Sequence, residues 1–277
     1  MSPQTKVYYV NGINLNVQIQ GDGEPLLLLH GYPDSMALWR KTIPTLVAKG
    51  YQVIVPDMRG FGGSDAPEGV KNYTIDLVVS DYLALLEQLK LNKVHLIAHD
   101  WGAIIGWYLA CKHPNRFYSY TALSVGHPKS YASAGWEQKR KAWYTLFFQL
   151  RGFAEWLILR HDGQWIRNFV DHHPETEHWI NDLSRPGRIT STINLYRANL
   201  WQVYTGKLPD CTIPVMGVWS TNDFALTEDN MTNSERYIAN DWRYERIESC
   251  GHWIPLDQPE MVSELIVDYL SSKPGVE

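Results

Sequence analysis

The sequence has few cysteines, no excess of basic residues and no long apolar run. Its three cysteines are widely spaced among 277 residues, which fits neither a disulfide framework nor a set of metal ligands. The net charge of −5 argues against a nucleic-acid-binding surface, which needs clustered lysine and arginine. We therefore expect reduced thiols, no metal, no nucleic-acid partner and a small neutral ligand.

The sequence also lacks targeting and membrane signals. No stretch approaches the roughly 20 consecutive apolar residues that cross a bilayer, and the N-terminus has no basic segment followed by an apolar run. We therefore expect a cytoplasmic protein without a membrane span.

A phosphate-binding glycine motif is absent as well. Residues 57–64 (Asp-Met-Arg-Gly-Phe-Gly-Gly-Ser) are rich in glycine, but they lack a Gly-Lys-Ser/Thr ending and the G-x-G-x-x-G spacing. We interpret this segment as a structural loop, and we expect no organic cofactor.

Short apolar runs and helical segments alternate along the chain. Residues 6–10 and 13–20 alternate around Asn11 and Gly12, which predicts an antiparallel hairpin. Continuous apolar runs follow, as expected for strands buried on both faces of a mostly parallel sheet. These runs lie at residues 25–29, 53–56, 94–97, 118–125, 214–219 and 244–247, with helices expected at residues 38–49, 75–89 and 103–111. The sequence thus predicts an α/β fold.

The strand pattern is interrupted between residues 128 and 208. This segment has a helical composition, is rich in aromatic residues and lacks short apolar strand runs. We expect a helical cap at residues 128–208, inserted into an α/β core formed by residues 1–127 and 209–277. Ligands of open α/β sheets bind beyond the C-terminal strand ends, where such a cap would lie.

An aspartate stands at a turn that often carries a nucleophile. Asp100 falls between the strand-like residues 94–97 and the helical residues 103–111, and its small neighbours Ala98 and Gly102 permit a tight turn. The helix N-terminus would keep the carboxylate ionised. Taken alone, this aspartate would be interpreted as an N-cap, but the motifs around it favour a nucleophile.

A carboxylate that attacks carbon becomes an ester, which an activated water must hydrolyse. His252 follows the last strand-like run on a loop, and we assign it as the base. Asp223 follows the strand at residues 214–219, and we assign it as the acid that orients His252. The pair Asn222 and Asp223 also suits a simple turn. Three other carboxylates are less well placed at a strand end, namely Asp210, Glu228 and Asp229.

Residues 30–33 (His-Gly-Tyr-Pro) follow the strand expected at residues 25–29. The loop after this strand usually supplies one N–H group of an oxyanion hole, and the residue after the nucleophile supplies another. We therefore expect the backbone N–H groups of Tyr32 and Trp101 to form the oxyanion hole.

Together these motifs resemble the α/β-hydrolase-fold epoxide hydrolases over nearly the whole chain. The resemblance rests on residues 30–33, 57–64, 99–102 (His-Asp-Trp-Gly) and 251–253 (Gly-His-Trp). It implies an α/β-hydrolase fold with an inserted helical cap. The chain departs from the family at Ala98, where the elbow often has glycine, but alanine is still small.

In that family two cap tyrosines hold and protonate the epoxide oxygen. Two cap segments here, residues 144–149 and 194–197, are similar to the family's segments. The resemblance therefore implies that Tyr144 and Tyr196 are the proton donors. From composition alone they would be ordinary core aromatics among 16 tyrosines.

The resemblance implies an enzyme that opens an apolar epoxide to a vicinal diol. Asp100 would form the ester, and water activated by His252 would hydrolyse it, without metal or organic cofactor. The related haloalkane dehalogenases use the same triad and hold a halide with indole N–H groups, a role open to Trp101 and Trp143. Tyr32 stands where that family often has asparagine, and a halide needs no proton from paired tyrosines. A third alternative is a non-catalytic ligand-binding protein of the same fold.

Overall fold

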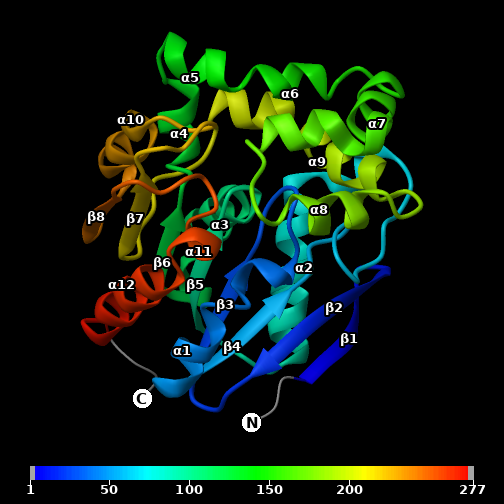
Figure 1. The fold of residues 1–277 in the computed structure, drawn as a ribbon. Coiled ribbons are helices and arrows are strands. Elements are labelled where there is room, and N and C mark those ends of the chain that lie inside the picture. The colour runs from blue at the N-terminus through cyan, green and yellow to red at the C-terminus, as the bar shows by residue number, and fades with distance from the viewer. Residues whose placement is uncertain (1–3, 274–277) are drawn as a thin grey trace.

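The structure, a computed structural model, describes residues 4–273 as a sheet covered by helices (Figure 1). The strands cross the sheet in the order β1-β2-β4-β3-β5-β6-β7-β8, with β1–β2 and β2–β4 antiparallel and the other pairs parallel. The strands are β1 (Gln4–Val10), β2 (Ile13–Gln20), β3 (Glu24–Leu29), β4 (Tyr51–Pro56), β5 (Val94–His99), β6 (Phe117–Leu123), β7 (Val215–Ser220) and β8 (Trp242–Ile247). The predicted α/β fold with a mostly parallel sheet is confirmed.

Burial on both faces explains the continuous apolar runs of the central strands. Every residue of β5 and β7 is buried, whereas β2 alternates, with Ile13, Leu15 and Val17 buried. Asn11 and Gly12 form the tight turn before β2, with φ values of 46° and 82°. The left-handed conformation at both positions is what a two-residue hairpin loop requires.

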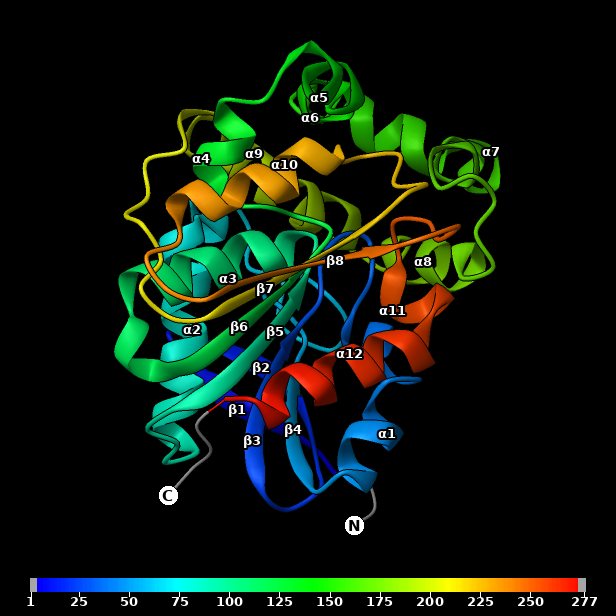
Figure 2. The same cartoon turned by 90° about the vertical axis from the view of Figure 1, so that its left-hand side faces the viewer.

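Helices cover both faces of the sheet (Figure 2). On one face lie α1 (Ile43–Ala48) and α12 (Pro259–Ser271), and on the other α2 (Ile75–Gln88) and α3 (Trp101–Lys112). The single helix expected at residues 38–49 is wrong. Instead, a 3₁₀ turn, Met36–Trp39, precedes α1, and Pro44 lies in the first turn of α1. A single helix over residues 38–49 would place Pro44 in its interior, where proline removes a backbone hydrogen bond and clashes with the preceding turn.

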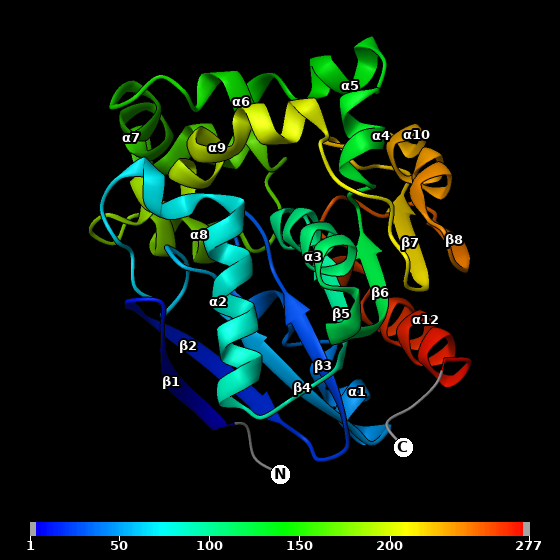
Figure 3. The same cartoon turned by 180° about the vertical axis from the view of Figure 1, so that it is seen from behind.

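In the chain, helices α4 to α9 follow β6 and precede β7. In space, they lie above the C-terminal ends of the parallel strands (Figures 1 and 3). The longest pair, α7 and α9, pack beside α8, and α7 is interrupted by non-helical backbone at residues 160–163. The six helices are α4 (Pro128–Ala132), α5 (Trp136–Lys141), α6 (Trp143–Phe147), α7 (Phe153–Phe169), α8 (Thr176–Leu183) and α9 (Arg188–Thr205).

Five short elements complete the described chain. Three are 3₁₀ turns, at Val70–Tyr73 before α2, at Pro114–Arg116 before β6 and at Asn233–Tyr237 before β8. The other two are the helices α10 (Glu228–Thr232) after β7 and α11 (Ile254–Asp257) after β8. Across residues 4–273, no helix is both long enough and apolar enough to span a bilayer.

Candidate active site

Asp100 lies at the turn between β5 and α3, with φ 53° and ψ −122°. Aspartate tolerates the left-handed helical region near φ of about +57° and ψ of about +47°, but the ψ of Asp100 lies far outside it, so the turn is strained. Two glycines allow the surrounding backbone to approach it. A Cβ atom on Gly31 would lie 2.1 Å from Oδ1 of Asp100, and one on Gly102 would lie 2.5 Å from the carbonyl oxygen of His30. The loop after β3 therefore packs directly against the elbow.

The Asp100 carboxylate lies against both groups expected to form the oxyanion hole. Its Oδ1 atom accepts a hydrogen bond from the backbone N–H of Tyr32 at 2.7 Å. Burial favours the neutral carboxyl. The hydrogen bond and charge of His252, with the backbone N–H of Trp101, more than offset burial and hold the pKa of Asp100 below its usual value. The carboxylate is therefore ionised at neutral pH.

His252 lies between two buried carboxylates. Its Nδ1 atom is 2.8 Å from Oδ2 of Asp223, and its Nε2 atom is 3.6 Å from Oδ2 of Asp100. Burial lowers the pKa of His252, but the charges and hydrogen bonds of Asp223 and Asp100 more than offset burial and raise it to about 10. The imidazole is therefore protonated at neutral pH beside the ionised carboxylate of Asp100.

Asp223 is held in place by the loop that follows β7. Its Oδ1 atom accepts hydrogen bonds from the backbone N–H groups of Ala225 at 2.8 Å and Leu226 at 2.9 Å. This leaves Oδ2 facing His252. The other carboxylates weighed in the sequence lie elsewhere: Asp210 pairs with Lys129, Glu228 accepts from Tyr244, and Asp229 is exposed.

The His252 backbone is held by His99, to which the sequence assigned no role beyond its place in the 99–102 motif, and by Ser124, which no motif indicated. The carbonyl oxygen of His252 accepts hydrogen bonds from Nε2 of His99 at 2.8 Å and from Oγ of Ser124 at 3.1 Å. Burial lowers the pKa of His99 to about 4, so this ring is neutral. The position of His99 directly before Asp100 was a usable signal, but its partner is 153 residues away in the chain.

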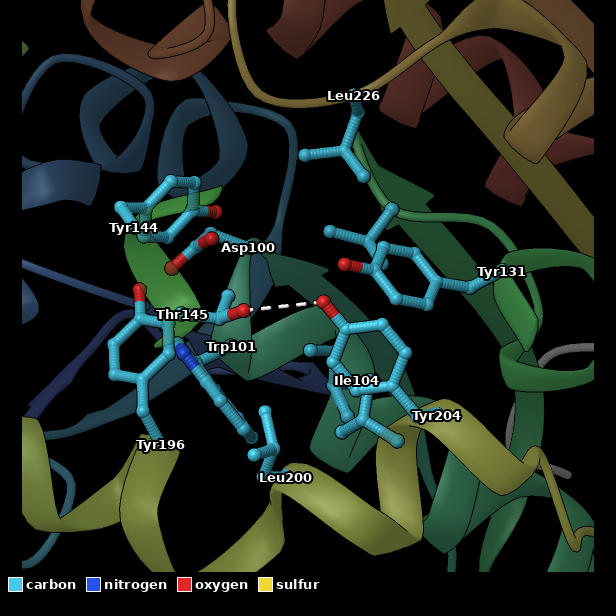
Figure 4. Close-up of a pocket in the computed structure, with 12 residues that line it drawn as sticks. Asp100, Trp101, Ile104, Tyr131, Tyr144, Thr145, Tyr196, Leu200, Tyr204 and Leu226 are labelled. Carbon is cyan, nitrogen blue, oxygen red and sulfur yellow. Dashed lines mark hydrogen bonds between the residues drawn. The ribbon is translucent and has the colours of Figure 1, made fainter. Parts of the chain in front are cut away.

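Tyr144 on α6 and Tyr196 on α9 point toward Asp100 from the inserted helices (Figure 4). Their ring centroids are 6.0 Å apart, and the Tyr196 ring is 4.9 Å from that of Trp101 in an edge-on contact. Burial, together with the charge of Asp100, raises the pKa of both phenols well above the usual value. Both hydroxyls therefore keep their protons.

These groups share one cavity (Figure 4). Asp100, Trp101, Tyr144 and Tyr196 line it. The rest of the wall is largely apolar with three further hydroxyl groups, and consists of Ile104, Val125, Leu200, Val203, Leu226, Tyr131, Thr145 and Tyr204. In the described part of the chain, no group of three or more His, Cys, Asp and Glu side chains could hold a metal ion.

The family model and the related sequences that match this chain indicate the same family. Residues 24–259 match the family described as alpha/beta hydrolase fold. AB hydrolase superfamily protein YfhM of Bacillus subtilis (strain 168) is 31% identical, over 95% of this chain and 96% of that protein. Epoxide hydrolase A of Mycobacterium tuberculosis (strain ATCC 25618 / H37Rv) is 27% identical, over 98% of each chain.

Solved structures of epoxide hydrolases have the same fold as this chain. The crystal structure of Bacillus megaterium epoxide hydrolase in complex with an inhibitor superposes with a TM-score of 0.88 at 25% identity, over 96% of this chain and 100% of that chain. The resemblance to epoxide hydrolases that the motifs indicated is thus confirmed, and the chain belongs to the alpha/beta hydrolase fold family.

Proposed function

We propose that this protein is an epoxide hydrolase that converts an apolar epoxide to a vicinal diol. One observation carries the proposal: an ionised carboxylate, Asp100, and two protonated phenols, Tyr144 and Tyr196, line the same cavity. A carboxylate can attack an epoxide carbon, and phenols can donate to the oxygen that becomes negative. The similarity to named epoxide hydrolases supports the proposal.

In the first step, Oδ2 of Asp100 attacks the less hindered epoxide carbon. The Oδ1 atom already accepts from the Tyr32 N–H, so Oδ2 is the oxygen available for attack. The carbon–oxygen bond of the epoxide breaks, and its electron pair moves to the epoxide oxygen. That oxygen accepts hydrogen bonds from Tyr144 and Tyr196 and takes a proton from one of them. The product is a glycol monoester of Asp100.

Ester formation lowers the pKa of His252, so that the imidazole can lose its proton before the second step. The new ester is uncharged, so one of the two carboxylates that raise the pKa of His252 is lost. The pKa of His252 falls, and the proton it releases replaces the one that the tyrosine donated. The neutral imidazole can then act as a general base.

In the second step, His252 takes a proton from water while the water oxygen attacks the ester carbonyl carbon. The N–H groups of Tyr32 and Trp101 stabilise the oxyanion, and Asp223 stabilises the imidazolium. Collapse of the intermediate expels the diol, whose alkoxide takes the proton back from His252. The carboxyl group left on Asp100 then gives its proton to His252, which restores the carboxylate and the imidazolium of the starting state. The scheme needs no metal or organic cofactor.

We assign the two parts of the site to two units of the chain. The core, residues 1–127 and 209–277, would supply the nucleophile, the acid and the base, and the cap, residues 128–208, would supply both tyrosines. The first three and last four residues of this division lie outside the described part of the chain. The largely apolar cavity wall supports an apolar substrate.

A haloalkane dehalogenase is the second candidate, because Trp101 lines the cavity beside Asp100. The other indole considered for a halide, that of Trp143, is 52% exposed and does not line this cavity. Paired protonated tyrosines also have no task when a halide leaves. These observations favour the epoxide.

The test is turnover of styrene oxide and 1,2-dibromoethane in parallel, scored as diol and bromide release. Asp100→Ala is the blank for both substrates. Diol without bromide is the expected result. Bromide without diol would assign the protein as a dehalogenase, and saturable binding of both compounds without turnover would replace the enzyme with a binding protein.

A further inference from the structure

The cavity holds a second group of hydroxyls that the reaction scheme does not use. They belong to Tyr131 on α4, Thr145 on α6 and Tyr204 on α9. Figure 4 shows the phenol oxygens of Tyr131 and Tyr204 pointing into the cavity from the side opposite Tyr144 and Tyr196. The cavity therefore has one polar end where the epoxide would react and another polar end in an otherwise apolar wall.

The proton positions in this cluster follow from counting donors. The Thr145 hydroxyl donates to the carbonyl oxygen of Ala142 at 2.8 Å. A hydroxyl has a single proton, so Thr145 can only accept in its 3.1 Å contact with the hydroxyl of Tyr204. Tyr204 is therefore the donor of that bond, and the protons of Thr145 and Tyr204 are both used within the protein.

Tyr131 is the member of the cluster that can turn its proton from the protein to a ligand. Its hydroxyl interacts with that of Tyr204, and the two ring centroids are 5.9 Å apart. Burial, and then the neighbouring Tyr204, raise the pKa of Tyr131, so its phenol stays protonated. Because Tyr204 directs its own proton to Thr145, the Tyr131 proton can turn either to the Tyr204 oxygen or to a molecule in the cavity.

We infer that the substrate is an epoxide whose apolar substituent carries a hydrogen-bond-accepting oxygen, such as an ether oxygen, and that Tyr131 donates to this oxygen. The inference rests on the proposed function and refines its substrate class. Thr145 and Tyr204 do not donate to this oxygen, since their protons go to Ala142 and Thr145. A pure hydrocarbon substituent offers no acceptor, so the Tyr131 proton would stay on the Tyr204 oxygen and the hydrogen bond to the substrate would be missing.

The test compares terminal epoxides of equal chain length. The reference is 1,2-epoxyoctane, and the four matched compounds replace the methylene at chain position 4, 5, 6 or 7 by an ether oxygen. The measured quantity is the ratio of kcat/KM for each ether to kcat/KM for 1,2-epoxyoctane. Since the intrinsic reactivity of each compound is the same for every variant, a change in this ratio between variants reports contacts with the ether oxygen.

We expect Tyr131→Phe to lower the ratio by about threefold to tenfold for at least one ether, as for the loss of one neutral hydrogen bond. Tyr204→Phe removes the same kind of atom from the same cluster but leaves the Tyr131 proton free, so the ratio for that ether should be retained. Tyr269→Phe is the control away from the cavity, because the Tyr269 hydroxyl is buried without a partner.

Two results would overturn the inference while leaving the proposed function standing. One is diol formation with ratios that Tyr131→Phe does not change for any ether. The other is an equal loss in Tyr131→Phe and Tyr204→Phe, which would remove the assignment of the donor to Tyr131. Absence of diol from all five compounds and from styrene oxide would instead overturn the proposed function, and this inference with it.

Discussion

The backbone N–H of Tyr32 donates a hydrogen bond to Oδ1 of Asp100 at 2.7 Å. The carboxylate thus has one oxygen against this donor and the other 3.6 Å from Nε2 of His252. After attack through Oδ2, the Oδ1 atom would become the ester carbonyl oxygen with little movement. It would already face the dipole that stabilises it when water adds, and such preorganisation is a large contribution to catalysis.

Gly31 permits this approach, so Gly31→Ala should disrupt it. The added Cβ would lie 2.1 Å from Oδ1 of Asp100 and 2.6 Å from the backbone nitrogen of Trp101. We expect kcat for diol formation to fall by about 100-fold or more, as when an oxyanion-hole donor is lost, together with a lower Tm. Gly135→Ala is the matched control, because a Cβ there meets no atom within 4 Å. Unchanged kcat in Gly31→Ala would contradict the proposed arrangement.

His252→Gln should separate the two chemical steps. The variant keeps Asp100 and both tyrosines, so the epoxide can open, but it has no base to activate water. Intact-protein mass spectrometry after incubation with styrene oxide should show a mass increase equal to one substrate molecule, and peptide mapping should place it on Asp100. The double variant with Asp100→Asn should stay unmodified. An unmodified single variant would count against the ester mechanism.

Replacement of the two cavity phenols should affect the first step. Tyr144→Phe and Tyr196→Phe each remove one donor to the epoxide oxygen, and general acid catalysis contributes about 10²- to 10⁴-fold. We expect the single variants to lose part of the rate of ester formation and the double variant nearly all of it, measured by rapid-quench mass spectrometry. Tyr269→Phe serves as the control. A double variant with the wild-type rate would place the proton donor elsewhere.

The raised pKa of His252 predicts a pH-dependent contribution to stability. The pKa is about 10 in the folded protein and about 6.5 in an unfolded chain. The folded state binds this proton more tightly, so the contribution is complete below about pH 6.5 and is lost as pH rises toward 10. Between pH 6.5 and 10, the Tm of the wild type should fall more steeply than that of His252→Gln. Parallel curves over this range would show that His252 is not held as a cation by Asp100 and Asp223.

Local sequence patterns were sufficient for most of the fold. The sequence predicted the turn at Asn11 and Gly12 and the buried strand β5, because both depend on residues that are neighbours in the chain. The helix expected at residues 38–49 failed for a local reason too, since Pro44 is compatible with the start of a helix but not with its interior. Local patterns could not predict the order of the strands across the sheet, because this order depends on how segments far apart in the chain pair.

In the site, too, local signals could be recognised from the sequence, whereas contacts between distant segments could not. Asp100 could be placed at its turn because the strand before it and the helix after it are local signals. Asp223 could be chosen over Asp210 and Glu228 because it directly follows a strand. Its 2.8 Å contact with His252, 29 residues away in the chain, depends on which loops meet at the sheet edge.

By itself, the sequence determined the alternation of strands and helices, the aspartate at the elbow and the family to which these motifs belong. Only the tertiary structure decided how the side chains around that aspartate are arranged, and it added Tyr131 and Tyr204, which no motif indicated. The phenols of Tyr131, Tyr144, Tyr196 and Tyr204 come from three helices and meet in one cavity. The reason is physical: helical periodicity specifies which face of a helix is buried, but the partner that covers this face is set by packing among segments far apart in the chain.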